Sequence, residues 1–232
     1  MNNLIVAHRG IYNNINIPEN SILAFKKALK YNYSIELDIQ MTKDNVIVVF
    51  HDNNLERMTK INNKISNMTY NEIKSIYLLS TKEKIPTLEE VLKLIDNKVL
   101  INIEIKYDKK YKLMIDNLIN LLNKYKGNYL VQSFDYKVLL YLKNKYPNIQ
   151  RGLLISNNKN KLAKYILDII NIKLLNINFI SISKKLLNNK KYIKLINKYK
   201  TFIWTIKTKE ELNIYLDKYY GYICDNLPYK KN

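Results

Sequence analysis

The feature that most constrains the fold is an alternation of short apolar runs with amphipathic helical patterns along nearly the whole chain. Strands that alternate with helices are typical of a parallel α/β sheet, and eight strands is the number that closes a (β/α)8 barrel. Eight such runs occur, at residues 4–7, 34–40, 99–105, 129–133, 151–155, 179–183, 202–206 and 222–224. The sequence therefore predicts an α/β fold, a TIM-type (β/α)8 barrel, with residues 1–232 in a single domain.

A further strand-like run directly follows the second predicted strand. Residues 46–50 are apolar and β-branched, and the connection before them is only a few residues long. A short connection joins antiparallel neighbours, because parallel strands need a crossover of a dozen or more residues. If residues 44–45 form a two-residue turn, Asp38 lies directly opposite His51. We expect a β-hairpin here, within a small insertion at about residues 41–85.

The charge balance is strongly basic. The chain has 39 Lys+Arg against 20 Asp+Glu, a formal net charge of +19. Most of these cations are Lys scattered among Asn, Ile and Tyr, a pattern typical of the residue bias of an AT-rich genome. No segment resembles a basic helix with aromatic platforms, so a nucleic-acid partner is not expected. The excess charge still favours attraction of an anionic small molecule to a cleft.

Cysteine content and hydropathy indicate the compartment. The single cysteine, Cys224, excludes an internal disulfide framework and a Cys-rich zinc site. The N-terminus has no basic segment before an apolar one, and no stretch reaches the roughly 18 apolar residues of a membrane span. We expect a cytoplasmic protein with neither signal peptide nor membrane span.

The two histidines of the chain both fall where a barrel would have its active site. Side chains at the carboxyl ends of barrel strands face that site. His8 follows the first strand, and His51 returns on the hairpin. A lone histidine is more often structural, but two placed together beside carboxylates favour catalysis. Two histidines of opposite protonation state can act as general base and general acid.

Three carboxylates belong to the same end of the predicted barrel. Glu36, Asp38 and Glu104 offer an all-oxygen site, which suits Mg²⁺ or Ca²⁺ better than a softer metal. Pairing with nearby Lys or Arg is the alternative. Glu104 argues for a cation, because it lies in an apolar run where an unpaired carboxylate is unfavourable. Arg9 and Lys106 are then placed to hold phosphate oxygens.

A series of short motifs extends these observations over about residues 5–228. Together, and in this order, they resemble the glycerophosphodiester phosphodiesterase family, in its cytoplasmic bacterial type. The motifs are Ala7-His8-Arg9-Gly10, Pro18-Glu19-Asn20-Ser21, Glu36-Leu37-Asp38, Thr42-Lys43-Asp44, His51-Asp52, Ile85-Pro86-Thr87-Leu88, Glu104-Ile105-Lys106, Ser133-Phe134, Trp204-Thr205 and Asp225-Asn226-Leu227-Pro228.

The resemblance implies a TIM-type barrel with a small insertion after the second histidine, one bound divalent cation, and hydrolysis of glycerophosphodiesters to glycerol 3-phosphate and an alcohol. By analogy His8 and His51 are the acid–base pair. The metal ligands are then Glu36, Asp38 and Glu104, and the phosphate contacts are Arg9 and Lys106. Glu19 matches an acidic position of the family, with a role in orientation or in support of the metal ligands.

The sequence departs from the family pattern in places that affect loop geometry and substrate preference. The hairpin turn reads Lys43-Asp44-Asn45 where the family prefers Asp-Gly, and Cys224 stands where a Thr is usual. No departure removes a matched catalytic residue. Three weaker candidates complete the site: Phe134 and Trp204 line the alcohol side or belong to the core, and Asp225 is a rim residue or a cap on the last turn.

Several alternatives remain open at this stage. The nucleophile is either the C2 hydroxyl of the substrate, which gives a cyclic phosphate that water then opens, or water itself. Rival functions are a phospholipase or sphingomyelinase D-like lyase that stops at the cyclic product, and a non-catalytic binding protein on the same barrel. The alcohol group, the choice between Mg²⁺ and Ca²⁺, the identity of the base and the oligomeric state are not determined by the sequence.

Overall fold

The computed structural model describes residues 4–156 and 172–225 of the chain. Its strands begin and end close to the predicted apolar runs. They are β1 (Leu4–His8), β2 (Ser34–Met41), β3 (Ile47–Val49), β4 (Ile101–Ile105), β5 (Tyr129–Ser133), β6 (Arg151–Ile155), β7 (Phe179–Ser183), β8 (Lys200–Ile206) and β9 (Gly221–Cys224).

These strands form one closed barrel with a single strand outside it. The order along the sheet is β1-β9-β8-β7-β6-β5-β4-β2-β3, and pairing of β1 with β2 closes the ring. Neighbours within the ring run parallel, whereas β3 pairs antiparallel with β2. The predicted eight-stranded α/β barrel with a hairpin after its second strand is confirmed.

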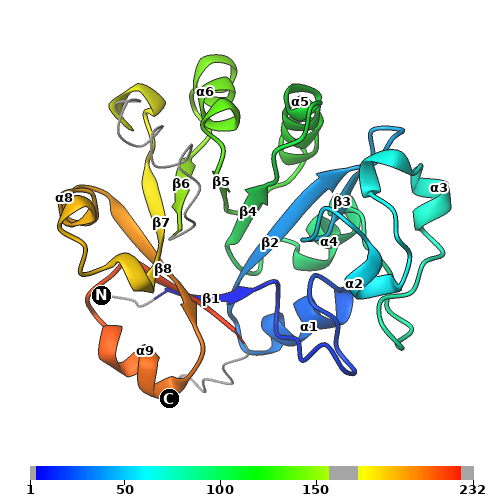
Figure 1. Ribbon diagram of the computed structural model, residues 1–232, viewed down its shortest axis with the longest axis horizontal. Helices are drawn as coiled ribbons and strands as arrows, with labels where there is room; N and C mark the ends of the chain where they lie inside the picture. The colour runs from blue at the N-terminus through cyan, green and yellow to red at the C-terminus, as the bar shows by residue number, and fades with distance from the viewer. Residues whose placement is uncertain (1–3, 157–171, 226–232) are drawn as a thin grey trace.

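Helices surround the barrel strands in Figure 1. An apolar stripe on each long helix packs against the outer face of the barrel, as in α4, whose buried side chains include Leu88, Val91 and Ile95. None of the helices among the described residues combines the length and apolar character needed to cross a membrane. The helices are α1 (Ile22–Lys30), α2 (Glu56–Thr59), η1 (Ile65–Asn67), α3 (Tyr70–Ile73), α4 (Leu88–Ile95), α5 (Tyr111–Leu122), α6 (Tyr136–Lys145), η2 (Ile172–Leu175), η3 (Lys184–Leu186), α8 (Lys190–Lys198) and α9 (Lys209–Tyr215).

The barrel interior is apolar at one end and polar at the other. Side chains two residues apart on a strand share a face. Val6 therefore lies on the same face as His8, and Leu130 on the same face as Gln132. Val6 and Leu130 pack with aromatic side chains from β7 and β8 in a small inner cluster, while the polar residues that follow them lie toward the carboxyl ends of the strands. This arrangement places ionisable side chains above an apolar floor.

The hairpin turn differs from the one predicted. Its loop contains three residues, 43–45, and Asn45 adopts a left-handed conformation with φ 69°. Loops of three residues often end in such a residue. The backbone N–H of Phe50 donates to the carbonyl of Asp38 at 2.9 Å, so Asp38 lies opposite Phe50. The prediction that it lies opposite His51 is wrong by one residue, because the loop is one residue longer than assumed.

The insertion builds a small core of its own beside β2 and β3, visible in cyan at the edge of the barrel in Figure 1. Its helices are short: α3 ends at Ile73, and an isolated bridge joins Tyr77 to Lys84. A capping box of Thr69 and Glu72 fixes the start of α3. The core is formed by Val48, Phe50, Leu55, Met58, Ile65, Ile73, Leu78 and Ile85.

Candidate active site

A cavity of about 600 Å³ opens at the carboxyl ends of the barrel strands. Loops after several strands contribute to its wall, as expected for a β/α barrel. Most of the predicted site residues meet here, although they are spread from the first strand to the eighth. Those that line it are His8, Arg9, Glu36, His51, Glu104, Lys106, Phe134 and Trp204.

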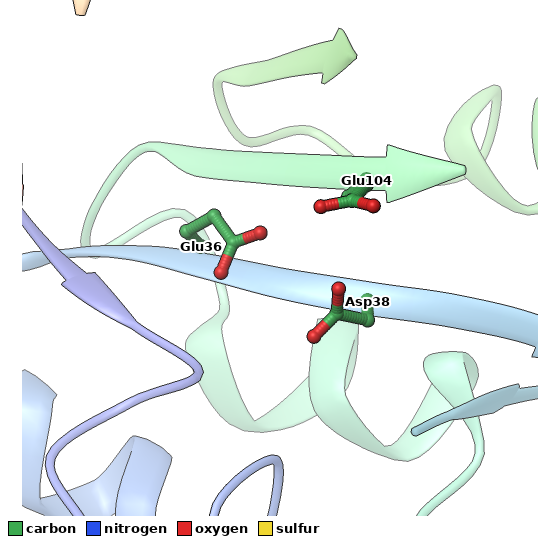
Figure 2. Close-up of side chains that lie close together, drawn as sticks. All are labelled: Glu36, Asp38 and Glu104. Atoms are coloured by element: carbon green, nitrogen blue, oxygen red, sulfur yellow. The ribbon is translucent and has the colours of Figure 1, made fainter. Parts of the chain in front are cut away.

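Three carboxylates converge at the inner wall of the cavity. Glu36 and Asp38 project from β2, and Glu104 projects from β4, where it is paired in register with Asp38. Figure 2 shows the three carboxylates pointing toward one another. One oxygen from each lies within 4.8 Å of the other two, and the residues are only 1%, 1% and 7% exposed. Oxygens about 2.4 Å from a common ion are at most about 4.8 Å apart, so this cluster could hold a hard divalent cation.

The electrostatics of the cluster favour such a cation. Burial, together with repulsion from Asp38 and Glu104, raises the pKa of Glu36 well above its usual range. Burial and the charge of Asp38 raise the pKa of Glu104 to about 7. Asp38 behaves oppositely: burial acts to raise its pKa, but Lys106 and Arg9 outweigh burial and hold that pKa below the usual range. Added positive charge would relieve the remaining repulsion.

Two cationic side chains lie at the border between the carboxylates and the cavity. Lys106 Nζ is 2.5 Å from Glu104 Oε1 and 2.8 Å from Asp38 Oδ1. Arg9 Nε lies 3.4 Å from Asp38 Oδ2. The side-chain amide of Asn20 donates to that same Asp38 oxygen at 2.9 Å. The carboxylates are therefore held in place, with both cations exposed to whatever enters the cavity.

The backbone after β1 explains how Arg9 reaches this border. Arg9 and Gly10 both adopt positive φ, 57° and 82°. A Cβ at Gly10 would lie 2.8 Å from Ala24 of α1, so the tight packing of this turn requires glycine. The Arg9 backbone N–H also donates to Glu36 Oε2 at 3.2 Å. The turn thus links the first histidine, the first arginine and Glu36 of the carboxylate cluster.

Each histidine is held through Nδ1 by an aspartate. His8 Nδ1 lies 2.7 Å from Asp225 Oδ1, and His51 Nδ1 lies 2.6 Å from Asp52 Oδ1. An ionised carboxylate only accepts hydrogen bonds, so in each pair Nδ1 carries the hydrogen. Nε2 of each ring is left for other partners. For His8 this atom lies 3.9 Å from Glu36 Oε2, at the edge of the acidic cluster.

Burial and charge adjust these pairs further. Burial lowers the pKa of His51, an effect that outweighs the opposing charge of Asp38. Burial acts to raise the pKa of Asp225, but the hydrogen bond and charge of His8, the hydrogen bond from Tyr12 and the charge of Arg9 together outweigh burial and lower that pKa. The hydroxyl of Tyr12 also donates to Asp225, at 3.2 Å. Asp225 is therefore a partner of His8 at the rim of the barrel, and the remainder of its motif, residues 226–228, lies outside the described residues.

Glu19 contacts guanidinium groups and not the three clustered carboxylates. It is 5% exposed. Its Oε1 accepts from Arg9 NH1 at 2.8 Å and from Arg57 NH2 at 2.6 Å, and its Oε2 accepts from the Asn14 amide at 2.8 Å. Of the two roles expected for Glu19, this geometry fits orientation of Arg9.

Phe134 and Trp204 form one wall of the cavity. Their rings meet edge to face with centroids 6.0 Å apart. Phe134 is 47% exposed, and the Trp204 indole N–H donates to the carbonyl of Ser181 at 3.0 Å. Phe134 thus lies at the open end of the barrel, whereas Trp204 lines the cavity and also packs against the small apolar cluster in the barrel interior.

Sequence reasoning missed three contributors to the site. Asn20 and Asp52 belong to the motifs but received no role, although each is adjacent to a residue that did. Arg57, on α2, was not singled out at all. A signal was present, because the chain has only three arginines among its 39 Lys+Arg and two of them are Arg9 and Arg57.

Comparison with known proteins identifies the family. Residues 8–221 match the Glycerophosphoryl diester phosphodiesterase family. The chain belongs to this family. A glycerophosphodiester phosphodiesterase of Caldanaerobacter subterraneus subsp. tengcongensis is 38% identical over 165 residues, which cover 66% of this chain and 67% of that protein.

Solved structures of similar fold agree. A glycerophosphodiester phosphodiesterase from Thermotoga maritima superposes with a TM-score of 0.78 at 25% identity, over 97% of this chain and 96% of that one. A phosphodiesterase from Oleispira antarctica, solved in complex with the product sn-glycerol-3-phosphate, superposes with a TM-score of 0.81 at 23% identity, over 96% and 93% of the chains. The chain is thus a glycerophosphodiester phosphodiesterase, a phosphoric diester hydrolase, as the resemblance predicted.

Proposed function

We propose that this glycerophosphodiester phosphodiesterase releases glycerol 3-phosphate and an alcohol, with His8 and His51 as its acid–base pair and one divalent cation held by Glu36, Asp38 and Glu104. The observation that carries the proposal is the shared cavity. Two imidazoles, each fixed through Nδ1 by an aspartate, line the same hollow as the buried carboxylates.

The carboxylate cluster fits a hard cation, either Mg²⁺ or Ca²⁺. Its three oxygens lie close enough together to share one ion, and the pKa values of Glu36 and Glu104 are raised by burial and by repulsion from neighbouring carboxylates. Oxygen ligands of this kind select hard cations over softer ones. When bound, such an ion neutralises charge on the phosphodiester and lowers the pKa of a hydroxyl or water.

Arg9 and Lys106 are the proposed phosphate contacts. Both lie at the border of the carboxylates and the cavity, where their charges face an incoming anion. A guanidinium can donate two parallel hydrogen bonds to a phosphate, while an ammonium acts as a point charge. The two residues would hold the phosphodiester with its bridging oxygens between the histidines.

The histidines would move two protons through Nε2. One imidazole accepts a proton from the attacking oxygen, a new P–O bond forms, and the other imidazole protonates the alcohol oxygen as its bond to phosphorus breaks. If the substrate C2 hydroxyl attacks, the product is a cyclic phosphate, and water opens it with the two histidines exchanging roles. If water attacks directly, glycerol 3-phosphate forms in one step.

The cavity suits a small-molecule partner. Phe134 and Trp204 would contact the alcohol portion, and a cavity of about 600 Å³ falls in the range typical of small ligands. The bound product of the Oleispira antarctica phosphodiesterase supports a glycerol 3-phosphate moiety as the portion that is recognised. The single catalytic domain over residues 1–232 and the cytoplasmic location stay predictions.

The first prediction tests reaction and metal together. Purified protein is stripped of metal and supplied with Mg²⁺ or Ca²⁺, and ³¹P NMR follows its action on glycerophosphocholine, glycerophosphoethanolamine and a lysophospholipid. We expect glycerol 3-phosphate with a glycerophosphodiester, and no turnover in excess EDTA, because the three clustered carboxylates would then repel one another and the phosphate.

Each departure from this result points to a different error. A cyclic phosphate as the end product would identify a lyase of the phospholipase or sphingomyelinase D kind. Substrate binding without turnover at any metal concentration would identify a binding protein. Full activity in metal-free protein would remove the cation from the mechanism.

A further inference from the structure

One guanidinium of the insertion lies between two carboxylates that serve different parts of the site. Arg57, on α2, places Nε 2.5 Å from Asp52 Oδ2. Its NH2 lies 2.6 Å from Glu19 Oε1, and its NH1 lies 3.2 Å from Glu19 Oε2. The Arg57 side chain is 46% exposed, so it reaches these carboxylates from the surface of the insertion.

The first carboxylate, Asp52, holds His51. Its Oδ1 accepts the hydrogen of His51 Nδ1 at 2.6 Å, while its Oδ2 accepts from Arg57. Because both oxygens are bonded, the carboxylate cannot rotate without breaking one contact. Asp52 is thereby fixed in the orientation that keeps the hydrogen of His51 on Nδ1 and leaves Nε2 free.

The second carboxylate, Glu19, holds Arg9. It is almost fully buried, so its charge must be compensated within the protein. Two guanidiniums meet at its Oε1: Arg9 NH1 at 2.8 Å and Arg57 NH2 at 2.6 Å. Arg9 in turn lies beside Asp38, one of the three clustered carboxylates. Arg57 therefore fixes the carboxylate that orients Arg9.

We propose that Arg57 is a positioning residue that holds His51 and Arg9 in fixed positions relative to each other, through Asp52 and Glu19. The inference rests on the proposed function, because it gives His51 a proton-transfer role and Arg9 a phosphate contact. Arginine suits the task better than lysine, since its planar fork donates in two directions at once. The insertion thus completes the catalytic geometry of the barrel and does more than cover one side of it.

A simple structural tether would use the same contacts. Arg57 also joins the insertion to the loop after β1, and its loss would weaken that attachment whether or not the chemistry depends on it. The two interpretations differ in what else changes. A tether affects the melting temperature alone, whereas a positioning residue affects kcat/KM and the state of the His51 ring in protein that remains folded.

The second prediction compares Arg57→Gln with Arg57→Lys and a matched control. We expect Arg57→Gln to lower kcat/KM by about 10- to 100-fold in the metal-loaded enzyme, the usual range when a group that orients a ligand or catalytic side chain is lost. Arg57→Lys should recover only part of this, since one ammonium cannot contact both carboxylates. Glu56→Gln changes an exposed neighbour on the same helix, with no ion pair among the described residues, and should stay within about twofold.

Variants of the two carboxylates separate the arms of the network. Asp52→Asn should act mainly on kcat, because it disturbs proton transfer, whereas Glu19→Gln should also raise KM, because Arg9 contacts the substrate. Combining Arg57→Gln with Asp52→Asn should cost less than the product of the single losses, since the two residues act as a unit. Fully multiplicative losses would contradict the coupling.

The His51 ring gives a readout that a tether would not move. The chain has two histidines, so ¹⁵N NMR of the imidazoles is assigned with a single His8→Gln variant. We expect the Nδ1-protonated tautomer for His51 in the wild type and a mixture of tautomers in Arg57→Gln. Millimolar guanidinium should restore part of the activity of Arg57→Ala, while sodium chloride at equal ionic strength should not.

Wild-type kcat/KM and an unchanged His51 spectrum in Arg57→Gln would overturn the inference. The same holds if the loss of activity only followed a lower melting temperature. Such results would leave the proposed function intact provided that His51→Ala is inactive. Absence of turnover in the wild-type, metal-loaded enzyme would instead remove the proposed function, and the inference with it.

Discussion

At the scale of single residues, the two histidines depend on partners from very different parts of the sequence. His51 is held by its neighbour Asp52, while His8 is held by Asp225, 217 residues further along the chain. Both pairs nevertheless end in the same geometry, with Nδ1 on a carboxylate and the cavity beside the ring. An imidazole fixed in this way presents one defined nitrogen to a substrate, which is what general acid–base catalysis requires.

The third prediction follows from this symmetry. Replacing His8 or His51 by Ala should lower kcat by at least ~10²-fold, the low end for a lost general acid or base, and should leave the melting temperature within a few degrees of wild type. The double variant should lose little more than the worse single one, because residues that act as a unit are not additive.

Steady-state kinetics on a good glycerophosphodiester measure both losses of kcat. The pH profile of the wild type should be bell-shaped, and its two limbs should report apparent pKa values of the histidine pair and not of either histidine alone. Near-normal kcat in His51→Ala would replace the paired mechanism with hydrolysis that needs a single histidine.

At the scale of elements, a carboxylate on α5 accepts hydrogen bonds from side chains of the neighbouring helix α6. Asp116 of α5 accepts hydrogen bonds from the hydroxyl of Tyr141 at 3.0 Å and from the hydroxyl of Tyr146 at 2.8 Å. Tyr141 lies on α6, and Tyr146 is the C-cap of α6. The ammonium of Lys145, also on α6, lies 2.8 Å from the same carboxylate. These contacts join neighbouring helices on the outside of the barrel. Burial acts to raise the Asp116 pKa, but the bonds from Lys145 and the tyrosines outweigh burial and lower that pKa.

The fourth prediction concerns this helix pair. Because the folded-state pKa of Asp116 lies below its unfolded value of 3.8, the carboxylate stabilises the fold above that pH and loses the effect as pH falls through the folded-state pKa. Asp116→Asn should therefore lower the free energy of unfolding by about 0.5 to 1 kcal/mol near pH 7, a size suited to a partly exposed cluster.

Urea unfolding at pH 7 and at acid pH measures the difference in free energy of unfolding between wild type and Asp116→Asn. This difference should vanish in acid. Glu89→Gln removes an exposed carboxylate from a pair with Lys93 and is the matched control; it should change stability by less than Asp116→Asn at pH 7. A difference that persisted unchanged in acid would show that packing, not charge, joins the helices.

At the scale of the whole molecule, the net charge of +19 surrounds a site whose substrate is an anion. The cavity is also lined by Lys185 and Lys207, in addition to the inner pair Arg9 and Lys106, and by Lys184, whose charge is paired with Glu211. A positive rim raises the local concentration of an anionic substrate, and dissolved salt screens that attraction. We therefore expect the basic composition to raise the rate of encounter with substrate, even if genome bias produced it.

The fifth prediction is a salt dependence. Between about 20 and about 200 mM NaCl, at constant free metal, kcat/KM should fall several-fold while kcat changes little, because screening acts on encounter and not on the bound complex. If kcat/KM did not change with salt, or if kcat fell by the same factor, the surface charge would not steer the substrate.

The sequence by itself determined the barrel and the types of side chain at the carboxyl ends of its strands. Strand positions such as 129–133, 151–155 and 179–183 agree with the structure because the apolar period of a buried strand is a local property. His8, Glu36, Asp38 and Glu104 could be placed together because the carboxyl ends of parallel barrel strands meet on one face, whatever the loops do.

Only the tertiary structure decided the partners of these residues. The three-residue hairpin loop moved His51 one position from its predicted neighbour, since turn geometry depends on whether one residue adopts positive φ. The bonds of Asp225 to His8 and of Arg57 to Glu19 join residues 217 and 38 positions apart. Such contacts exist because the barrel closes and the insertion folds back on it, and no local pattern encodes where two distant loops meet.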